Sequence, residues 1–188
     1  DGIFAASTRV YTNISREFPF LARMDRVPKK MVFSRLFSAM NFTGFYSPYT
    51  GESSLNVDSP ACLLPANIAH ELAHQRGIAS EQECNFLAIA ASTSSGHPVY
   101  QYSGYLMGFI HLGNALYRAD PERYAALWAD LPDAVKADLR YHSAYWDQFE
   151  GLTATVSKRI YDSSLKSYGQ TDGIQSYGTV VDLLTAYY

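Results

Sequence analysis

The sequence predicts a mainly α-helical protein with a small β element, an α+β class, folded as a single domain over residues 1–188. Three observations favour this class. Apolar residues recur at helical spacing after residue 60, residues 41–60 contain β-type runs between glycines and prolines, and hydrophobic residues make up 47% against 18% charged. This composition is typical of a globular chain. A chain of this length buries roughly 70% of its unfolded surface, so it needs no disulfide framework.

The first 60 residues contain the predicted β element. One or two short helices are expected within residues 1–40, and two β-type runs, at 43–47 and 54–57, flank a turn that contains Pro48 and Gly51. This pattern predicts a small hairpin. One of its strands could border a cleft and pair with an extended peptide. The alternative is a simple capping loop.

The chain after Pro60 is expected to be largely helical. Pro65 suits the first position of a helix from Ala66 to about Arg76, and Gly77 suits its left-handed C-terminal cap. Ser80 with Glu83 matches a capping box that opens the next helix. Further helices are expected at 99–118, 121–129, 132–167 and 176–186.

Charge excludes one class of partner. The net charge is -3, the pI is about 5.9, and the longest basic cluster is Pro28-Lys29-Lys30. We therefore expect no nucleic-acid binding. No run approaches the roughly 18 consecutive apolar residues that cross a bilayer.

The segment Ala69-His70-Glu71-Leu72-Ala73-His74 contains the zinc-peptidase signature His-Glu-x-x-His. Residues four apart share one helix face, so His70 and His74 can bind the same Zn²⁺. Glu71 lies beside them and could act as general base toward a water held at the open metal position. The alternative is a solvated helix on which the two histidines are incidental.

A catalytic zinc site needs a third protein ligand. Glu81 is the first candidate, because a turn at Gly77 would return the start of the next helix to the metal. Glu83 is the second candidate, since the capping box already gives it a structural role. Asn85, one turn after Glu81, could hydrogen-bond a ligand imidazole.

Other residues have open roles. Tyr168 and Tyr177 are the preferred catalytic candidates for stabilising the oxyanion of a tetrahedral intermediate, with His97, His111 and His142 as further possibilities. A buried structural histidine is the favoured interpretation of His111. The two cysteines, Cys62 and Cys84, could form one disulfide or remain reduced.

The ligand spacing resembles that of gluzincins, zinc peptidases whose third ligand is a glutamate, here with a short loop before it. The segment 81–85 also resembles the Glu-x-Glu-Ala-Asp/Asn element of several peptidase families, whose first glutamate corresponds to Glu81. Cys84 stands where alanine is usual.

Segments 44–52, 70–87 and 169–177 together resemble an uncharacterised bacterial family, a domain of unknown function with a His-Glu-x-x-His motif. Its members are identified as zinc metallopeptidases whose domain follows N-terminal transmembrane helices. The resemblance implies a zincin-like helical core and membrane association through an anchor outside this chain. An extracytoplasmic location is then expected, although the composition fits either side of a membrane.

These observations lead us to expect a zinc-dependent peptidase whose metal is held by His70, His74 and Glu81, with Glu71 as base and a peptide or protein as substrate. A zinc-containing binding or regulatory module without turnover is one alternative. A metal-dependent hydrolase of a non-peptide amide is another. The sequence does not indicate an oligomeric state.

Overall fold

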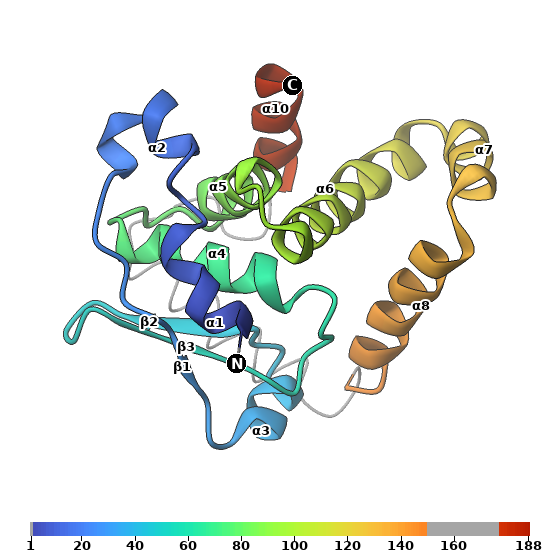
Figure 1. The fold of residues 1–188 in the computed structure, drawn as a ribbon. Helices are drawn as coiled ribbons and strands as arrows, with labels where there is room; N and C mark the ends of the chain where they lie inside the picture. The colour runs from blue at the N-terminus through green and yellow to red at the C-terminus, as the bar shows by residue number, and fades with distance from the viewer. Residues whose placement is uncertain (1, 150–176) are drawn as a thin grey trace.

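The computed structural model describes residues 2–149 and 177–188 (Figure 1). Of these residues, 65% lie in helices and 6% in strands, which confirms the mainly α-helical class with a small β element. Within the described ranges, no helix is both long and apolar enough to cross a membrane.

The N-terminal segment consists of short helical turns that support the central helix of the fold. They are α1 (Gly2–Ala6), η1 (Ser7–Arg9), α2 (Ile14–Glu17) and η2 (Pro19–Leu21). The side chains of Val10, Tyr11 and Ile14 are buried in the core. The Tyr11 hydroxyl also donates to the backbone oxygen of Ala69 at 2.8 Å, which fixes this segment against the middle of α4 (Leu64–Gln75).

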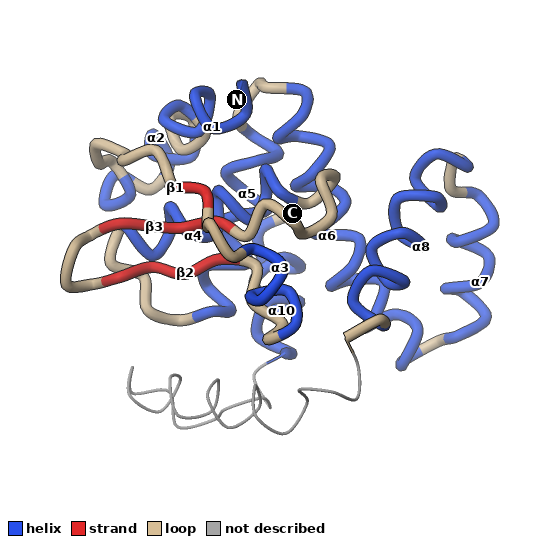
Figure 2. The backbone as a smooth tube through the Cα atoms, turned by 90° about the horizontal axis from the view of Figure 1, so that it is seen from below, coloured by secondary structure: helices blue, strands red, loops and turns tan. Residues whose placement is uncertain are grey.

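The predicted hairpin is present and belongs to a three-stranded sheet. Its strands are β1 (Lys29–Lys30), β2 (Gly44–Ser47) and β3 (Glu52–Leu55), in the order β1-β3-β2. β3 pairs antiparallel with β2 and parallel with β1 (Figure 2). The two-residue strand β1 was not predicted, because its pairing with β3 depends on a contact between segments far apart in the sequence. Among the described residues, β2 lies at the edge of the sheet.

A layer of helices covers one face of the sheet. α4 lies directly on β2 and β3, and α5 (Glu81–Ser94) and α6 (Pro98–Ala119) pack on α4 (Figure 1). α10 (Tyr177–Tyr187) packs in turn on α5 and α6. The core is buried between these helices, with side chains from Leu55, Ile68, Leu72, Ala88, Leu106 and Leu184.

Two helices extend to one side of this body (Figure 2): α7 (Pro121–Asp130) and α8 (Asp133–Asp147). The prediction of a helix over 132–167 is wrong at its end, since α8 stops at Asp147. The backbone N–H of Phe149 donates to the oxygen of Trp146 and tightens the last turn, while the side-chain amide of Gln148 donates to the oxygen of Tyr145. The predicted range beyond residue 149 lies outside the described residues.

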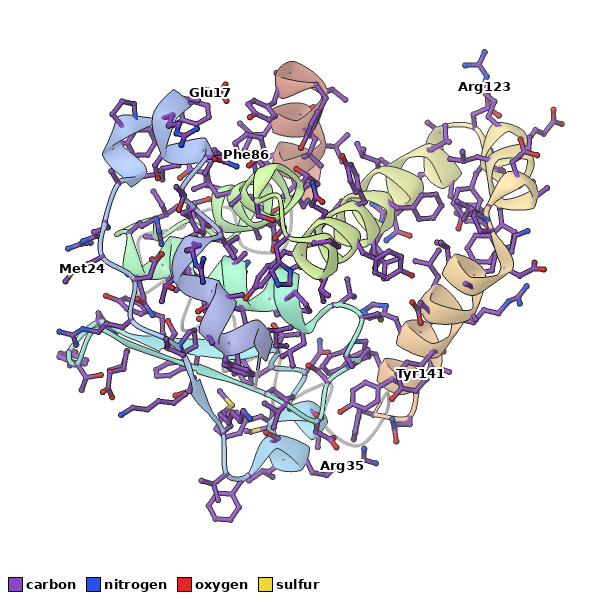
Figure 3. All side chains as sticks on the ribbon, viewed as in Figure 1. Glu17, Met24, Arg35, Phe86, Arg123 and Tyr141 are labelled. Atoms are coloured by element: carbon purple, nitrogen blue, oxygen red, sulfur yellow. The ribbon has the colours of Figure 1, made fainter. Side chains whose placement is uncertain are left out.

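The end of α8 contacts α3 (Ser34–Ala39), a short helix that precedes strand β2 in the chain. Arg35 of α3, labelled in Figure 3, donates to the side-chain oxygen of Gln148 at 2.8 Å and to Asp58 at 3.2 Å. The Asp58 carboxylate also accepts from the hydroxyl of Tyr145. These contacts hold α8 against the loop that precedes α4.

Candidate metal centre

The turn between α4 and α5 brings their functional residues together. Gly77 has φ +87°, which residues other than glycine adopt only at a cost. Its N–H donates to the oxygen of His74, and the N–H of Ile78 donates to that of Ala73. This is the Schellman pattern of helix termination. Ser80 then caps α5, accepting from the N–H of Glu83, so the predicted caps at both ends of the turn are confirmed.

The two motif histidines are each held by a hydrogen bond at Nδ1. In His70 this nitrogen donates to the side-chain oxygen of Asn85 at 2.8 Å. In His74 it donates to the backbone oxygen of Ile78 at 2.9 Å, an acceptor that the Gly77 turn supplies. Because both acceptors are carbonyl oxygens, Nδ1 carries a proton in each ring. When the ring is in its neutral form, its lone pair is therefore on Nε2.

Both Nε2 atoms face the carboxylate of Glu81, the first residue of α5. The distance from Nε2 to a carboxylate oxygen is 3.1 Å for His70 and 3.6 Å for His74. The three side chains are between 12% and 27% exposed, so solvent reaches them from one side. Glu83, the second candidate ligand, is exposed on the outer side of α5.

The electrostatics of this group favour a positive charge between its members. Burial alone would lower the pKa of His74, but contacts with Cys84 and Glu81 dominate and raise it to about 12. Burial would raise the pKa of Glu81, but hydrogen bonds from both histidines lower it well below its usual range. Both pKa shifts mean that a positive charge between the histidines and Glu81 is stabilised, and either a proton or a metal ion can supply that charge.

The donor set fits zinc. Ligands about 2.0–2.1 Å from a tetrahedral Zn²⁺ lie about 3.3 Å from one another, close to the separations found here. Two imidazole nitrogens and one carboxylate are also a donor combination of catalytic zinc sites that keep a fourth position open. Three atoms with lone pairs repel each other when no cation lies between them, so the arrangement favours an ion at this point.

Glu71 is placed beside the histidines but points between α4 and β2. Its side chain is buried, with an exposed fraction of 4%, and its Oε2 has no hydrogen-bond partner within the described part of the chain. Burial raises the pKa of Glu71 to about 6, against the lowering effect of the charges on His70 and His74. Gly44 of β2 is packed on this carboxylate, where a Cβ would overlap Glu71.

Two residues near the histidines were not predicted as part of the site. Tyr46 of β2 stacks on His74, with ring centroids 6.2 Å apart and planes 12° apart. The alternation along β2 could have indicated it, since Tyr46 shares a strand face with Gly44. Cys84 places its sulfur 3.4 Å from Nδ1 of His74.

Cys84 offers a third ligand atom within 4.8 Å of the histidine nitrogens. We favour Glu81 as the ligand, because the thiol lies on the Nδ1 side of His74 and Glu81 lies on the Nε2 side of both rings. Burial also raises the pKa of the Cys84 thiol to about 11. Cys62 and Cys84 are both free, so of the two alternatives the reduced pair is present.

The remaining predicted residues are only partly placed. Tyr168 lies outside the described residues, and Tyr177 begins α10 with a side chain that is also outside them. His111 and His142 do not join the metal candidates but line a hollow beside α4. His97 directly precedes α6 without a side-chain capping hydrogen bond, and its ring packs edge-on against Tyr100. The oxyanion role of the tyrosines therefore stays a prediction.

Comparison with known proteins places the chain in a family. The model of a family described as "Protein of unknown function (DUF3810)" matches residues 1–185, so the chain belongs to this family. No curated protein and no solved structure matches it.

Proposed function

We propose that this member of the DUF3810 family is a zinc-dependent peptidase. The observation that carries the proposal is the convergence of the Nε2 atoms of His70 and His74 on the carboxylate of Glu81. Each imidazole is held by an acceptor at Nδ1, which leaves the opposite nitrogen free to bind a metal. His70, His74 and Glu81 would hold the zinc, and bound zinc would supply a Lewis acid and a more acidic water.

Glu71 is suited to the proton transfers of amide hydrolysis. A general base works best when its pKa lies near the working pH, and burial raises the pKa of Glu71 to about 6. Its unpartnered Oε2 is free to accept a proton from the attacking water. The same carboxyl can then return that proton to the leaving amine, which completes the transfer without another acid.

The edge strand favours a peptide over other amides as substrate. In the part of the chain that the structure describes, β2 has β3 on one side and forms the edge of the sheet on the other, next to Glu71 and His74. An extended peptide can pair its backbone with such an edge. Pairing along β2 would bring a peptide bond past the carboxylate of Glu71.

The first experiment measures metal and activity separately. Protein purified without added metal should contain about one zinc per chain by mass spectrometry, as expected of a tetrahedral protein site. The variants His74→Ala and Glu81→Ala should lose this zinc, while Glu83→Ala, which removes an exposed carboxylate from the same helix turn, should keep it.

Hydrolysis is then assayed on a library of quenched fluorescent peptides. Glu71→Gln preserves the size of the side chain and should keep the zinc but lose at least about 100-fold in rate, the usual contribution of a general base. A variant that binds zinc and cleaves at the wild-type rate would remove Glu71 from the mechanism. A zinc-loaded wild type without any cleavage would favour a binding module.

A further inference from the structure

A hollow opens beside α4, one turn away from the candidate metal centre. It has a volume of about 110 Å³ and is open to solvent. We call it the side pocket, and its lining comes from the loop before β2, the loop before α4, and helices α4, α6 and α8: Thr43, Pro60, Leu63, Asn67, Met107, Ile110, His111, His142 and Trp146.

The side pocket is lined by residues that are close neighbours of the candidate catalytic residues along the chain. Asn67 lies three residues before His70 and four before Glu71, which places all three on neighbouring positions of one helix face. One helical turn spans about 5.4 Å along the axis. Thr43 directly precedes Gly44, which packs on the Glu71 carboxylate. When a peptide bond of the substrate lies at Glu71, the side chain of the adjacent substrate residue can therefore reach the side pocket.

The lining is uncharged. It contains no Asp, Glu, Lys or Arg, and its aliphatic part comes mainly from Leu63, Met107 and Ile110. The indole N–H of Trp146 donates to Nε2 of His142 at 3.1 Å, so this nitrogen keeps a lone pair and the ring is neutral. Burial lowers the pKa of His142 and of His111, in agreement with neutral rings.

We propose that the side pocket receives an aromatic or large aliphatic side chain of the substrate, at the residue next to the peptide bond that is cut. This inference rests on the proposed peptidase function and specifies its substrate class. A charged side chain would lose its hydration among these walls without gaining an opposite charge, so the side pocket would reject it. Trp146 and the aliphatic walls offer contact to a flat ring.

Binding of two hydroxamates to the zinc-loaded protein tests the proposal without turnover. The probes are a succinyl hydroxamate that carries a benzyl group and its unsubstituted parent, measured by titration calorimetry. Burial of the benzyl group should strengthen binding by about 10- to 100-fold relative to the parent.

The variant Ile110→Trp fills the side pocket and should abolish this difference between the probes. Its control is Leu112→Trp, which adds the same bulk to α6 at a position that is 38% exposed and does not line the pocket. Zinc content and thermal unfolding show whether each variant folds. If Ile110→Trp does not fold, Ile110→Ala replaces it. By widening the pocket, Ile110→Ala should favour a naphthylmethyl hydroxamate over the benzyl one.

The outcomes separate the two proposals. If the parent hydroxamate binds but the benzyl group does not strengthen binding, the proposal of a metal centre is retained. The proposal that the side pocket receives a substrate side chain is then wrong. The same holds if the benzyl preference survives in Ile110→Trp. If the protein binds no zinc and neither probe, the peptidase proposal fails and the inference about the side pocket fails with it.

Discussion

Gly44 lies so close to the Glu71 carboxylate that a Cβ at position 44 would overlap it. This contact joins the edge strand β2 to α4 at the catalytic candidate. Ser53 of the neighbouring strand β3 strengthens the connection, since its hydroxyl donates to the backbone oxygen of Glu71 at 3.1 Å. The sheet therefore determines where the carboxylate of Glu71 points, although the metal candidates are all on helices.

Gly44→Ala should displace the Glu71 side chain and leave the zinc in place. A shift of about 1 Å in a catalytic group can cost about 100-fold in rate, so kcat should fall by this order while zinc content stays at the wild-type level. The control is Gly108→Ala, whose added Cβ makes only ordinary contact with Ile89. Unchanged kcat in Gly44→Ala would show that Glu71 tolerates displacement, contrary to a role as general base.

Asn85→Ala should weaken zinc binding without removing a ligand. Asn85 accepts from Nδ1 of His70, and loss of such a partner lowers metal affinity by about 10- to 100-fold. Competition with a chromophoric chelator measures the affinity. Glu83→Ala, an exposed position on the same helix, provides the control and should retain the wild-type affinity. Equal affinity in both variants would mean that Asn85 does not orient His70.

The local part of the candidate site was predictable from sequence. The spacing of His70 and His74, the Gly77 cap and the Ser80 cap all act within one or two turns of the chain, so residue types alone indicated them. These caps also bring Glu81, rather than Glu83, to the histidines.

Contacts between distant segments were not predictable in this way. The strand β1 exists through its pairing with β3, and Tyr46 reaches His74 only because β2 lies under α4. The end of α8 at Asp147 likewise depends on contacts of the residues that follow it, such as that of Gln148 with Arg35. No periodicity of the sequence carries this information.

Asp58 should make stability depend on pH in the acid range. A hydrogen bond from Tyr145 is the largest cause that lowers the pKa of Asp58, and Arg35 and Ser38 contribute further bonds. Because the folded-state pKa is lowered, this stabilisation is present above the unfolded pKa of about 3.9 and is lost as the pH falls through the folded value.

The Asp58 side chain is 34% exposed, so solvent screens its contacts. Thermal unfolding of Asp58→Asn should therefore show a Tm at most about 2–4 °C below wild type at pH 7, which corresponds to no more than roughly 1 kcal/mol in a chain of this size. The difference in Tm between the two proteins should close as the pH falls below about 4, because the Asp58 carboxyl of the wild type becomes protonated in this acid range. Tyr145→Phe removes the principal hydrogen bond to Asp58, so the Tm of this variant should also depend less on pH in the acid range than the Tm of the wild type. A gap that is constant across pH would mean that the charge on Asp58 does not contribute.

Gly77→Ala should weaken both the fold and the metal site, and Gly96→Ala should weaken only the fold. Both glycines have positive φ, +87° and +73°, and neither has an atom within 4 Å of an added Cβ. The backbone penalty of about 1–2 kcal/mol is therefore expected at both positions. Urea unfolding of the two variants measures this shared loss of stability.

Only Gly77 positions the Ile78 oxygen that accepts from Nδ1 of His74. Its substitution strains the turn that also carries Glu81 toward the histidines, so zinc affinity should fall about 10-fold. Gly96 lies at the far end of α5 from Glu81, between α5 and α6, and its variant should bind zinc as the wild type does. Competition with a chelator measures the zinc affinity of both variants. Equal affinities would mean that the shape of the Gly77 turn does not affect zinc binding.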